Sequence, residues 1–576
     1  MRLFPKKGLV FAFVRWTILF FLLFCMPLSL YALKLTNISI KGIGGDSLLN
    51  IQHRLSELYK DKPLNEISPD ALRMQVAKAL YPYGYFKPQI SVGINHTKNT
   101  ISIDVMPGEK LLITSLTVKI IGEGADNLEL QTVRQNLPIK VGQPLNSVFY
   151  EKAKDDLSNA AEQAGYMHAS FETARIVIDQ LRYTADVTLI FQTGPQYYFG
   201  SVSFNSNLLS SDLLSRYVPF KYGQPYSLDK ITALNQNLVS SGYFNAVNVS
   251  PVLDASKNVP IEVDLEPASR VKYSVGAGYG TDTGPRGRLG LSVIPVNRAG
   301  HKFTAVAQGS FTENALLGQY IIPGADPIAD QYSLNGGFTN LTYNAGRSNA
   351  VLLGVAKQHT VTNFQRTLSL NGLHERYNYT GLSTVEESLM FPKAVFTWSK
   401  TSDVLFSPSG YNITVSGLGA SKGLLSQVSL GQFSINLKAA LTLDAIRTRF
   451  YVHGFQGYTP INDINQLPLS LALLLGGSDN LKGYNFNSIG PGRITSYAGL
   501  ELQKETFNKV FIIGFFDTGD VYDPVVRETK YDAGVGIMWV SPVGPIKLEL
   551  AQAINQQGLR IPEQGLKFVV NMGPDL

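Results

Sequence analysis

The second half of the chain alternates apolar and polar side chains over long stretches. Residues 433–443 carry apolar side chains at the odd positions, and residues 566–572 carry them at the even positions. Alternation with a period of two predicts β-strands with one apolar and one polar face. Segments of about ten such residues suit tilted strands that cross a lipid bilayer. Residues 270–576 contain no apolar run of about 18 residues, which excludes transmembrane helices from this half.

The size of this half favours a membrane barrel over a soluble β-sandwich, which would show the same alternation. At about 19 residues for each strand with its connection, residues 270–576 predict roughly 16 antiparallel strands. A bilayer also requires the sheet to close, because unpaired edge groups find no partner in hydrocarbon. Aromatic residues in the apolar set support the membrane as well: Phe515, Phe516, Tyr522 and Trp539.

The first half changes to a mixed pattern of short strands and amphipathic helices. Within 109–195 the pattern predicts a strand, two helices and a hairpin, at 111–121, 128–136, 147–164, 168–178 and 186–192. Ser147 is the candidate N-cap of the second helix, and Gly165 is its candidate C-cap. The predicted order is therefore β-α-α-β-β.

Two short motifs recur through this half at a nearly constant interval. Three prolines lie 81 residues apart: Pro63, Pro144 and Pro225. Each is followed by a glycine-tyrosine pair, at 84–85, 165–166 and 242–243. A period near 80 predicts three copies of one domain in series, which we expect at 33–108, 109–195 and 196–268, before a barrel at 269–576. The third copy has four residues fewer between its proline and its glycine, which is about one helical turn.

The first 32 residues predict a secretory signal peptide, with a basic start and then an almost wholly apolar stretch. A retained N-terminal anchor is the alternative, although the apolar stretch is short for a spanning helix. The only cysteine, Cys25, lies in this segment, so cleavage would leave no disulfide, thiol nucleophile or cysteine-based metal site. Cleavage would also lower the net charge from +6 to about +2, which gives no sign of nucleic-acid binding.

Candidate catalytic or ligand-binding residues do not form any familiar pattern. The seven histidines are scattered, and no pair has the spacing of metal ligands. Gly276, Gly278 and Gly280 do not predict a phosphate-binding loop, because the sequence after them cannot begin a helix. We therefore expect no enzyme activity, no cofactor, no metal and no bound nucleotide.

Both halves resemble parts of a known family. The three copies resemble POTRA (polypeptide-transport-associated) domains in element order, length and helix-Gly-Tyr-strand junction. The β half resembles the outer-membrane assembly-factor superfamily, and within it the barrel subunits of translocation and assembly modules. Five segments carry this resemblance in the family's order: 279–286 (YGTDTGPR), 476–484 (GGSDNLKGY), 515–519 (FFDTG), 541–546 (SPVGPI) and 573–576 (GPDL).

The resemblance implies a protein of the bacterial (Gram-negative) outer membrane with its POTRA domains in the periplasm. Such proteins help to insert or translocate clients, and POTRA domains bind extended segments by adding a strand to a sheet edge. The implied partners are a TamB-like periplasmic protein anchored in the inner membrane, unfolded outer-membrane protein clients such as autotransporters, and the lipid bilayer. Two alternatives stay open: a two-partner-type secretion transporter, and a passive porin or lipid-handling barrel.

For 476–484 the resemblance implies a loop that folds into the barrel, with the motif residues Leu481, Lys482, Gly483 and Tyr484. The family usually has arginine where this chain has Lys482, and that side chain contacts the acid of an F-x-D-x-G strand. Here the acid is Asp517, followed by Gly519, and Glu501 is a candidate second acid. Lysine offers a point charge instead of a planar fork, so we expect a pair of poorer geometry. The alternative is an ordinary solvated loop lysine.

In the family, the first and last barrel strands form a lateral gate. We predict these strands at 271–280 and 565–572, with glycine on both sides of the last strand. The predicted gate residues are Val271, Tyr273, Val275, Gly565, Leu566, Phe568, Val570 and Gly573. Glycine weakens strand pairing, and an exposed strand edge templates association with another strand. A weak seam would therefore offer an edge to a client.

Overall fold

The computed structural model describes residues 38–59, 67–95, 100–252, 256–281, 283–403, 405–524, 528–542, 544–555 and 565–573. The predicted signal segment and Cys25 lie outside these ranges. The described residues fall into two compact units. One runs to Tyr198 and includes Gly223–Leu228, and the other holds most of the third repeat with the barrel. None of the helices in the described ranges is long and apolar enough to cross a membrane.

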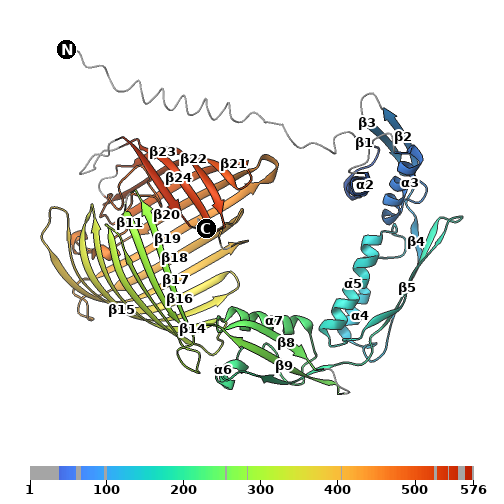
Figure 1. The fold of residues 1–576 in the computed structure, drawn as a ribbon, viewed down its shortest axis with the longest axis horizontal. Coiled ribbons are helices and arrows are strands. Elements are labelled where there is room, and N and C mark those ends of the chain that lie inside the picture. Colours follow the sequence, from blue (N-terminus) through green and yellow to red (C-terminus); the bar gives the residue numbers. More distant parts are fainter. Residues whose placement is uncertain are drawn as a thin grey trace, which may run out of the picture. The chain divides into compact units, whose positions relative to one another are not determined.

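Three repeats of the order β-α-α-β-β precede the barrel, as predicted (Figure 1). The first consists of β1 (Ile38–Lys41), α2 (Gly45–Tyr59), α3 (Pro69–Leu80), β2 (Gln89–Asn95) and β3 (Thr100–Met106). The second consists of β4 (Leu112–Ile121), α4 (Leu128–Gln135), α5 (Ser147–Gln163), β5 (Ser170–Asp179) and β6 (Thr184–Gln192). The third consists of β7 (Tyr198–Phe204), α6 (Ser211–Ser215), α7 (Leu228–Ser240), β8 (Phe244–Pro251) and β9 (Asn258–Pro267).

Each repeat builds a three-stranded sheet with its last strand in the centre, in the orders β1-β3-β2, β4-β6-β5 and β7-β9-β8. The first strand runs parallel to the central strand in the first two repeats. The second and third strands form an antiparallel hairpin in every repeat. The outer strands of each sheet consequently keep one edge outside the three-stranded ladder.

Helix α5 shows how apolar spacing fixes the core of a repeat. Its buried residues recur every three or four positions: Tyr150, Ala153, Leu157, Ala160 and Ala161. This spacing gives one apolar stripe, which packs in the same core as the inward residues of β6. The predicted N-cap was wrong by one residue. Asn146 has the extended backbone of a cap and its side chain accepts from Val148 N, so Ser147 is the first helical residue.

The recurring glycines follow their helices with left-handed backbone, but the predicted C-cap of α5 was wrong by one residue, since Ala164 is the C-cap and Gly165 comes next. Gly84, Gly165 and Gly242 have φ of +88°, +90° and +78°, which glycine adopts without a steric penalty. The shorter spacing in the third repeat is a shorter helix. Helix α5 has 17 residues and α7 has 13, a difference of about one turn.

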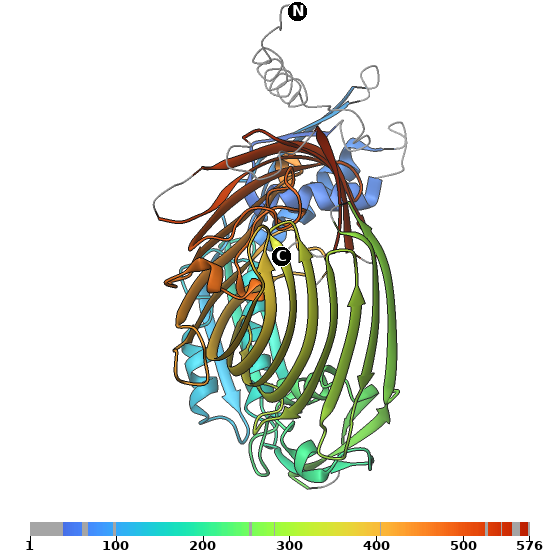
Figure 2. The same cartoon turned by 90° about the vertical axis from the view of Figure 1, so that its left-hand side faces the viewer.

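The remaining strands form one sheet of 16 antiparallel strands in chain order, which confirms the predicted strand number (Figure 2). Its first half is β10 (Val271–Gly280), β11 (Gly284–Val293), β12 (Lys302–Gly309), β13 (Glu313–Pro323), β14 (Asp330–Tyr343), β15 (Gly346–Val361), β16 (Phe364–Tyr379) and β17 (Val385–Thr401). Its second half is β18 (Gly410–Ala420), β19 (Leu430–Leu443), β20 (Thr448–Tyr458), β21 (Ile494–Phe507), β22 (Val510–Tyr522), β23 (Lys530–Ser541), β24 (Gly544–Ala553) and β25 (Leu566–Met572).

The sheet curls into a barrel whose first and last strands lie near each other (Figure 2). Every consecutive pair from β10 to β25 shares an antiparallel ladder. Across the described residues, β10 and β25 share no such ladder. The barrel is therefore nearly closed, with one seam that lacks strand pairing.

Alternation along the strands separates an outer from an inner face, as predicted. On β19 the exposed residues include Phe433, Ile435 and Leu437, while the polar residues between them point inward. The grouping of Phe515 with the outer aromatics was wrong. Consecutive residues of a strand face opposite sides, so Phe516 is exposed and Phe515 is buried inside the barrel.

The third repeat is joined to the barrel by several polar contacts within the second compact unit. Tyr243 donates its hydroxyl to Gly300 O, and Lys302 Nζ donates to Ser241 O at 2.7 Å. Both barrel partners belong to the β11–β12 connection or the strand that follows it. Tyr217 hydrogen-bonds Tyr243, and burial raises the pKa of Tyr217 to about 12. The junction is thus built from buried tyrosines that remain neutral hydroxyls at physiological pH.

Candidate functional site

The connection between β20 and β21 folds into the barrel. At its base Leu475 and Ile489 form an antiparallel bridge, and we name residues 475–489 the inward loop. Leu481 and Tyr484 are fully buried there and pack with Tyr497 of the barrel wall. The apolar parts of these side chains hold the loop inside the barrel, where a buried polar group without a partner would be costly.

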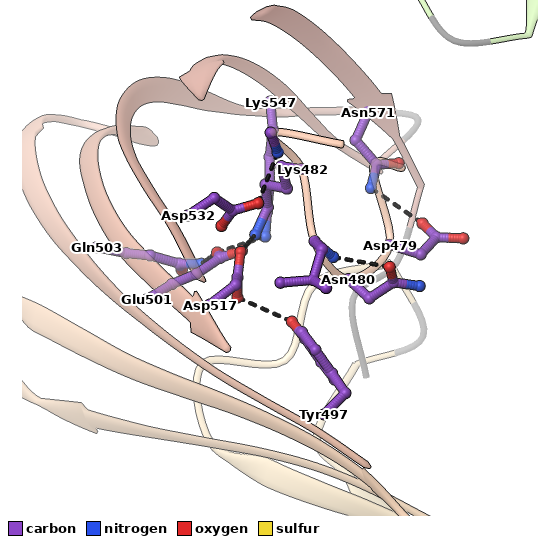
Figure 3. Close-up of polar contacts among 12 residues, drawn as sticks. Asp479, Asn480, Lys482, Tyr497, Glu501, Gln503, Asp517, Asp532, Lys547 and Asn571 are labelled. Carbon is purple, nitrogen blue, oxygen red and sulfur yellow. Dashed lines mark hydrogen bonds and ion pairs between the residues drawn. The ribbon is translucent and has the colours of Figure 1, made fainter. Parts of the chain in front are cut away.

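Lys482 projects from the inward loop to two acids of the wall (Figure 3). Its Nζ lies 2.9 Å from Asp517 Oδ2 and 3.3 Å from Glu501 Oε1. The same Nζ lies 4.2 Å from the centre of the Phe515 ring, a cation–π contact. The residue is 4% exposed. The single ammonium group of Lys482 makes all three contacts, in different directions.

The strand register explains why the two acids meet. Glu501 belongs to β21 and Asp517 to β22, and Gly499 is paired directly with Asp517. A Cβ at Gly499 would lie 2.2 Å from Asp517 Oδ1, so only glycine leaves room for the carboxylate. Because side chains alternate, Glu501 points to the same inner face two residues further along β21.

Each acid has a second partner that the sequence did not reveal. Tyr497 donates its hydroxyl to Asp517 Oδ1 at 2.8 Å. Lys547 on β24 donates to Glu501 Oε2 at 2.7 Å, and Gln503 donates to the same oxygen at 2.9 Å. Both carboxylates are therefore bonded through both oxygens. Alternating charged and apolar residues in 546–553 were the available signal for Lys547.

The main chain of the inward loop is fixed to β23 and β24. Gly483 N donates to Asp532 Oδ2 at 2.6 Å. A Cβ at Gly483 would lie 2.6 Å from Ala553 N, so the loop touches the wall too closely for any other residue. The Tyr484 hydroxyl lies within hydrogen-bond distance of two carbonyl oxygens, Tyr531 O at 3.0 Å and Asn555 O, which share its one proton. Together these contacts bind the tip of the loop to the same wall that holds Lys482.

Acidic groups outnumber lysines around this site. The buried acids are Glu501, Asp517, Asp532 and Glu549, and the buried lysines are Lys482 and Lys547. Glu549 is 0% exposed, and neither of its carboxylate oxygens has a hydrogen-bond partner among the described residues. Buried charge without a partner is costly, so a charged Glu549 would destabilise the folded barrel.

Gly519, the last residue of the F-x-D-x-G segment, lies beside the base of the loop rather than beside Lys482. A Cβ there would come within 2.7 Å of Ser496 O and 3.1 Å of Leu475 Cδ1. One further motif, G-x-S-x-G at 419–423, falls on the hairpin between β18 and β19. A nucleophilic serine of this motif requires a strand-to-helix turn, which this hairpin does not provide.

The predicted gate residues lie on or directly beside β10 and β25, the two strands on either side of the seam. Val271, Tyr273 and Val275 are exposed on the outer face of β10, with Tyr273 and Val275 about four-fifths exposed. On β25 the outer face carries Leu566, Phe568 and Val570, and the strand is flanked by Gly565 and Gly573. These residues do not approach Lys482. The structure instead places β10 and β25 at the seam, and the inward loop further inside the barrel.

The inward loop also reaches the last strand from the inside. Lys567 Nζ lies 2.6 Å from Asn485 Oδ1, and Asn571 Nδ2 lies 3.4 Å from Asp479 Oδ1 (Figure 3). Lys567 and Asn571 are inward-facing residues of β25, two positions either side of Val569. One loop therefore connects the wall at β21–β24 with a strand of the seam. Sequence reasoning did not anticipate this link.

Family comparisons agree with this architecture. Residues 329–573 match the Omp85 superfamily domain. Residues 37–107 match the model described as POTRA domain TamA domain 1. Residues 197–268 match a POTRA model described as surface antigen variable number repeat. The first and third repeats thus match POTRA models, and the barrel matches Omp85.

One solved structure shows the same fold at low identity. BamA from Haemophilus ducreyi lacking POTRA domains 1–3 is 16% identical, with a TM-score of 0.65 over 80% of this chain and 98% of that one. CdiB from Acinetobacter baumannii is 12% identical, with a TM-score of 0.48 over 92% of this chain and 100% of that one. CdiB from Escherichia coli is 13% identical, also with a TM-score of 0.48, over 93% and 99%. The barrel is accordingly similar to the Omp85 superfamily domain over residues 329–573, and the first and third repeats are similar to POTRA domains, the first to the TamA type.

Proposed function

We propose that this protein is a TamA-type assembly factor, which guides unfolded outer-membrane proteins such as autotransporters to a laterally gated barrel. In this proposal residues 1–32 are the signal peptide, 33–108, 109–195 and 196–268 are periplasmic POTRA domains, and 269–576 form the barrel. The match of residues 37–107 to a TamA-type domain supports the subfamily. The partner would be a TamB-like periplasmic protein anchored in the inner membrane.

The observation that carries the proposal is the seam between β10 and β25. In a closed barrel every edge is paired, because unpaired main-chain groups are costly in hydrocarbon. Here the described parts of the two strands share no ladder, and β25 pairs with β24 over only seven residues. Two strand edges next to each other can accept a client strand by β-augmentation. The seam would thus serve as the lateral gate.

The inward loop has a supporting role in this proposal. Lys482, Asp517 and Glu501 form a buried ion-pair network that fixes the loop to the wall. Such a network contributes specificity of position more reliably than stability. We propose that this network, with Leu481, Gly483 and Tyr484 around it, keeps the inside of the barrel in one arrangement while the seam opens.

A disulfide across the seam tests the proposal. Cysteine pairs would join inward-facing residues of the two strands: Ser274→Cys with Val569→Cys, and Gly276→Cys with Lys567→Cys. The matched control is Val275→Cys with Leu289→Cys, which links β10 to its paired neighbour β11. The only native cysteine, Cys25, lies in the predicted signal segment.

The locked seam should stop client assembly in cells, and a reducing agent should restore it. The control disulfide should leave assembly intact. Full client assembly by the oxidised seam variants would refute the gating role. A large steady single-channel conductance that is unchanged by the lock would favour a passive porin instead.

A further inference from the structure

The outer face of β13–β17 carries a polar row at the ends remote from the third repeat. Each residue of this row is paired in register with the next one, on the neighbouring strand: Asn314, Asn340, Asn349, Arg376 and Glu386. Asn314 Nδ2 donates to Asn340 Oδ1 at 3.3 Å, and Asn340 Nδ2 donates to Asn349 Oδ1 at 2.8 Å. The row therefore crosses neighbouring strands in direct register.

Alternation shows that this row faces outward. On β16 the even-numbered Leu368, Leu370 and Arg376 are exposed, while the odd-numbered Leu373 and Tyr377 are buried inside. Exposed Val351, Leu353 and Val355 continue the apolar outer face on β15. The polar row thus sits at the upper limit of an apolar band that faces lipid.

An aromatic cluster marks the opposite limit of the band. Phe364, Phe396 and Trp398 stack together, and Arg366 of β16 pairs in register with Phe396. Aromatic girdles mark membrane interfaces in such barrels. From Arg366 to Arg376, a strand rising about 3.3 Å per residue and tilted about 40° climbs about 25 Å, the height of the apolar band of an outer-membrane barrel. Arg376 is therefore at the level of the lipid headgroups of the other leaflet.

Two arginines lie at this level on neighbouring strands. Arg347 on β15 and Arg376 on β16 are exposed, and Asn349 is paired directly with Arg376. Arg347 lies two residues from Asn349, so the two arginines are diagonal neighbours, about 7–8 Å apart at the backbone. Within the described residues neither arginine forms an ion pair. The nearest acid in the row, Glu386, lies 3.5 Å from His374 Nε2.

We propose that Arg347 and Arg376, with Asn349 between them, bind the phosphate group of an outer-leaflet lipid headgroup. Two guanidinium forks spaced in this way can donate to one phosphate from two sides. Asn349 uses its carbonyl oxygen to accept from Asn340, which leaves its amide nitrogen as a third donor. The position of the site in the outer leaflet rests on the proposed placement of the POTRA domains in the periplasm.

The test uses the folded full chain in detergent and a bis-phosphorylated glycolipid as the probe, followed by native mass spectrometry. The same glycolipid without its phosphates is the reference ligand. The double variant Arg347→Gln/Arg376→Gln removes the proposed donors. The matched control, Lys357→Gln/Arg366→Gln, removes two outward charges from the same strands at the opposite interface.

The arginine double variant should bind the phosphorylated glycolipid at least about tenfold more weakly, since charge-assisted hydrogen bonds are the strong ones. The control variant and the dephosphorylated glycolipid should show no such change. Equal loss in both double variants, or no loss in the first, overturns the proposal. Displacement of the lipid by inorganic phosphate at matched concentration would show a free-anion site and overturns it too. The seam disulfides leave these residues unchanged, so failure here and failure of the gating test are separable.

Discussion

Lys482 and Asp517 are 35 residues apart in sequence and meet inside the barrel, with Nζ 2.9 Å from Oδ2. The contact joins a loop to the second strand after it and is shielded from solvent on all sides. Removing one partner of such a pair leaves an uncompensated buried charge, which is far more costly than an exposed pair.

Replacement of Lys482 by methionine should therefore destabilise the barrel by about 3–5 kcal/mol, because Asp517 and Glu501 would both lose their shared cation. The measurement is the midpoint of thermal unfolding in detergent, read by heat-modifiable gel migration. Lys400→Met is the control, since Lys400 is exposed. Lys482→Arg should retain most of the stability, because the charge remains. Equal midpoints for Lys482→Met and the control would contradict a structural role of the pair.

Glu501 and Glu549 should respond in opposite ways to the same substitution. Glu501→Gln removes the acid that Lys482 and Lys547 share, and should cost about 3 kcal/mol. Glu549→Gln removes a buried carboxylate whose oxygens have no hydrogen-bond partner in the described part of the chain, and should be neutral or stabilising. Thermal midpoints of the two variants provide the comparison. A larger loss for Glu549→Gln would mean that its charge has a partner of its own.

Gly483→Ala should displace the inward loop without removing any charge. The new methyl group would lie 2.6 Å from Ala553 N, a backbone atom that cannot move aside. The expected result is faster proteolysis within 475–489 in the folded protein. Gly287→Ala is the matched control, because a Cβ there meets no atom within 4 Å. Identical proteolysis of the two variants would show that the loop tolerates the methyl group.

Tyr243→Phe should loosen the junction between the third repeat and the barrel. It removes the hydroxyl that donates to Gly300 O while keeping the buried ring, so about 1 kcal/mol of contact energy is lost. Spin labels on α7 and on the β13–β14 connection should report a broader distance distribution. Tyr222→Phe serves as the control, since Tyr222 is 71% exposed. If the distance distribution of Tyr243→Phe were as narrow as that of the native protein, packing alone would hold the junction together.

The cap of α5 gives a simple test of the corrected helix boundary. Asn146→Ala should weaken the first turn by about 1 kcal/mol, whereas Ser147→Ala should have little effect. Amide hydrogen exchange in 147–150 measures the difference in the intact protein. Faster amide exchange in Ser147→Ala than in Asn146→Ala would instead identify Ser147 as the N-cap.

The sequence predicted the parts of the fold that depend on local pattern. The length of the β half predicted the strand number, alternation predicted the outer face of β19, and the glycine-tyrosine pairs predicted where α5 and α7 end. The position of Lys482 next to Asp517 followed from the resemblance, not from the pattern. Alternation assigns a residue to one face of the sheet, but it does not say which residue of the neighbouring strand lies opposite it.

Register explains what was missed. Tyr497, Lys547 and Asp532 join the site because their strands are aligned by ladders that no single strand encodes. Phe515 was misassigned because either of two neighbouring phenylalanines could face lipid. Asp517 faces the inside of the barrel, so Phe516 faces outward and Phe515 faces inward. The shift from Ser147 to Asn146 arose because both residues can cap, and only backbone geometry decides between them.

The links from Asp479 and Asn485 to β25 make the two sides of the seam unequal. The inward loop connects β25 to β21, β22, β23 and β24. We therefore expect these five strands to behave as one rigid part of the barrel. In the described part of the chain β10 is paired only with β11, and it presents small inward residues such as Ser274, Gly276 and Gly278. If the seam widens, we therefore expect β10 to move away while β25 stays in place.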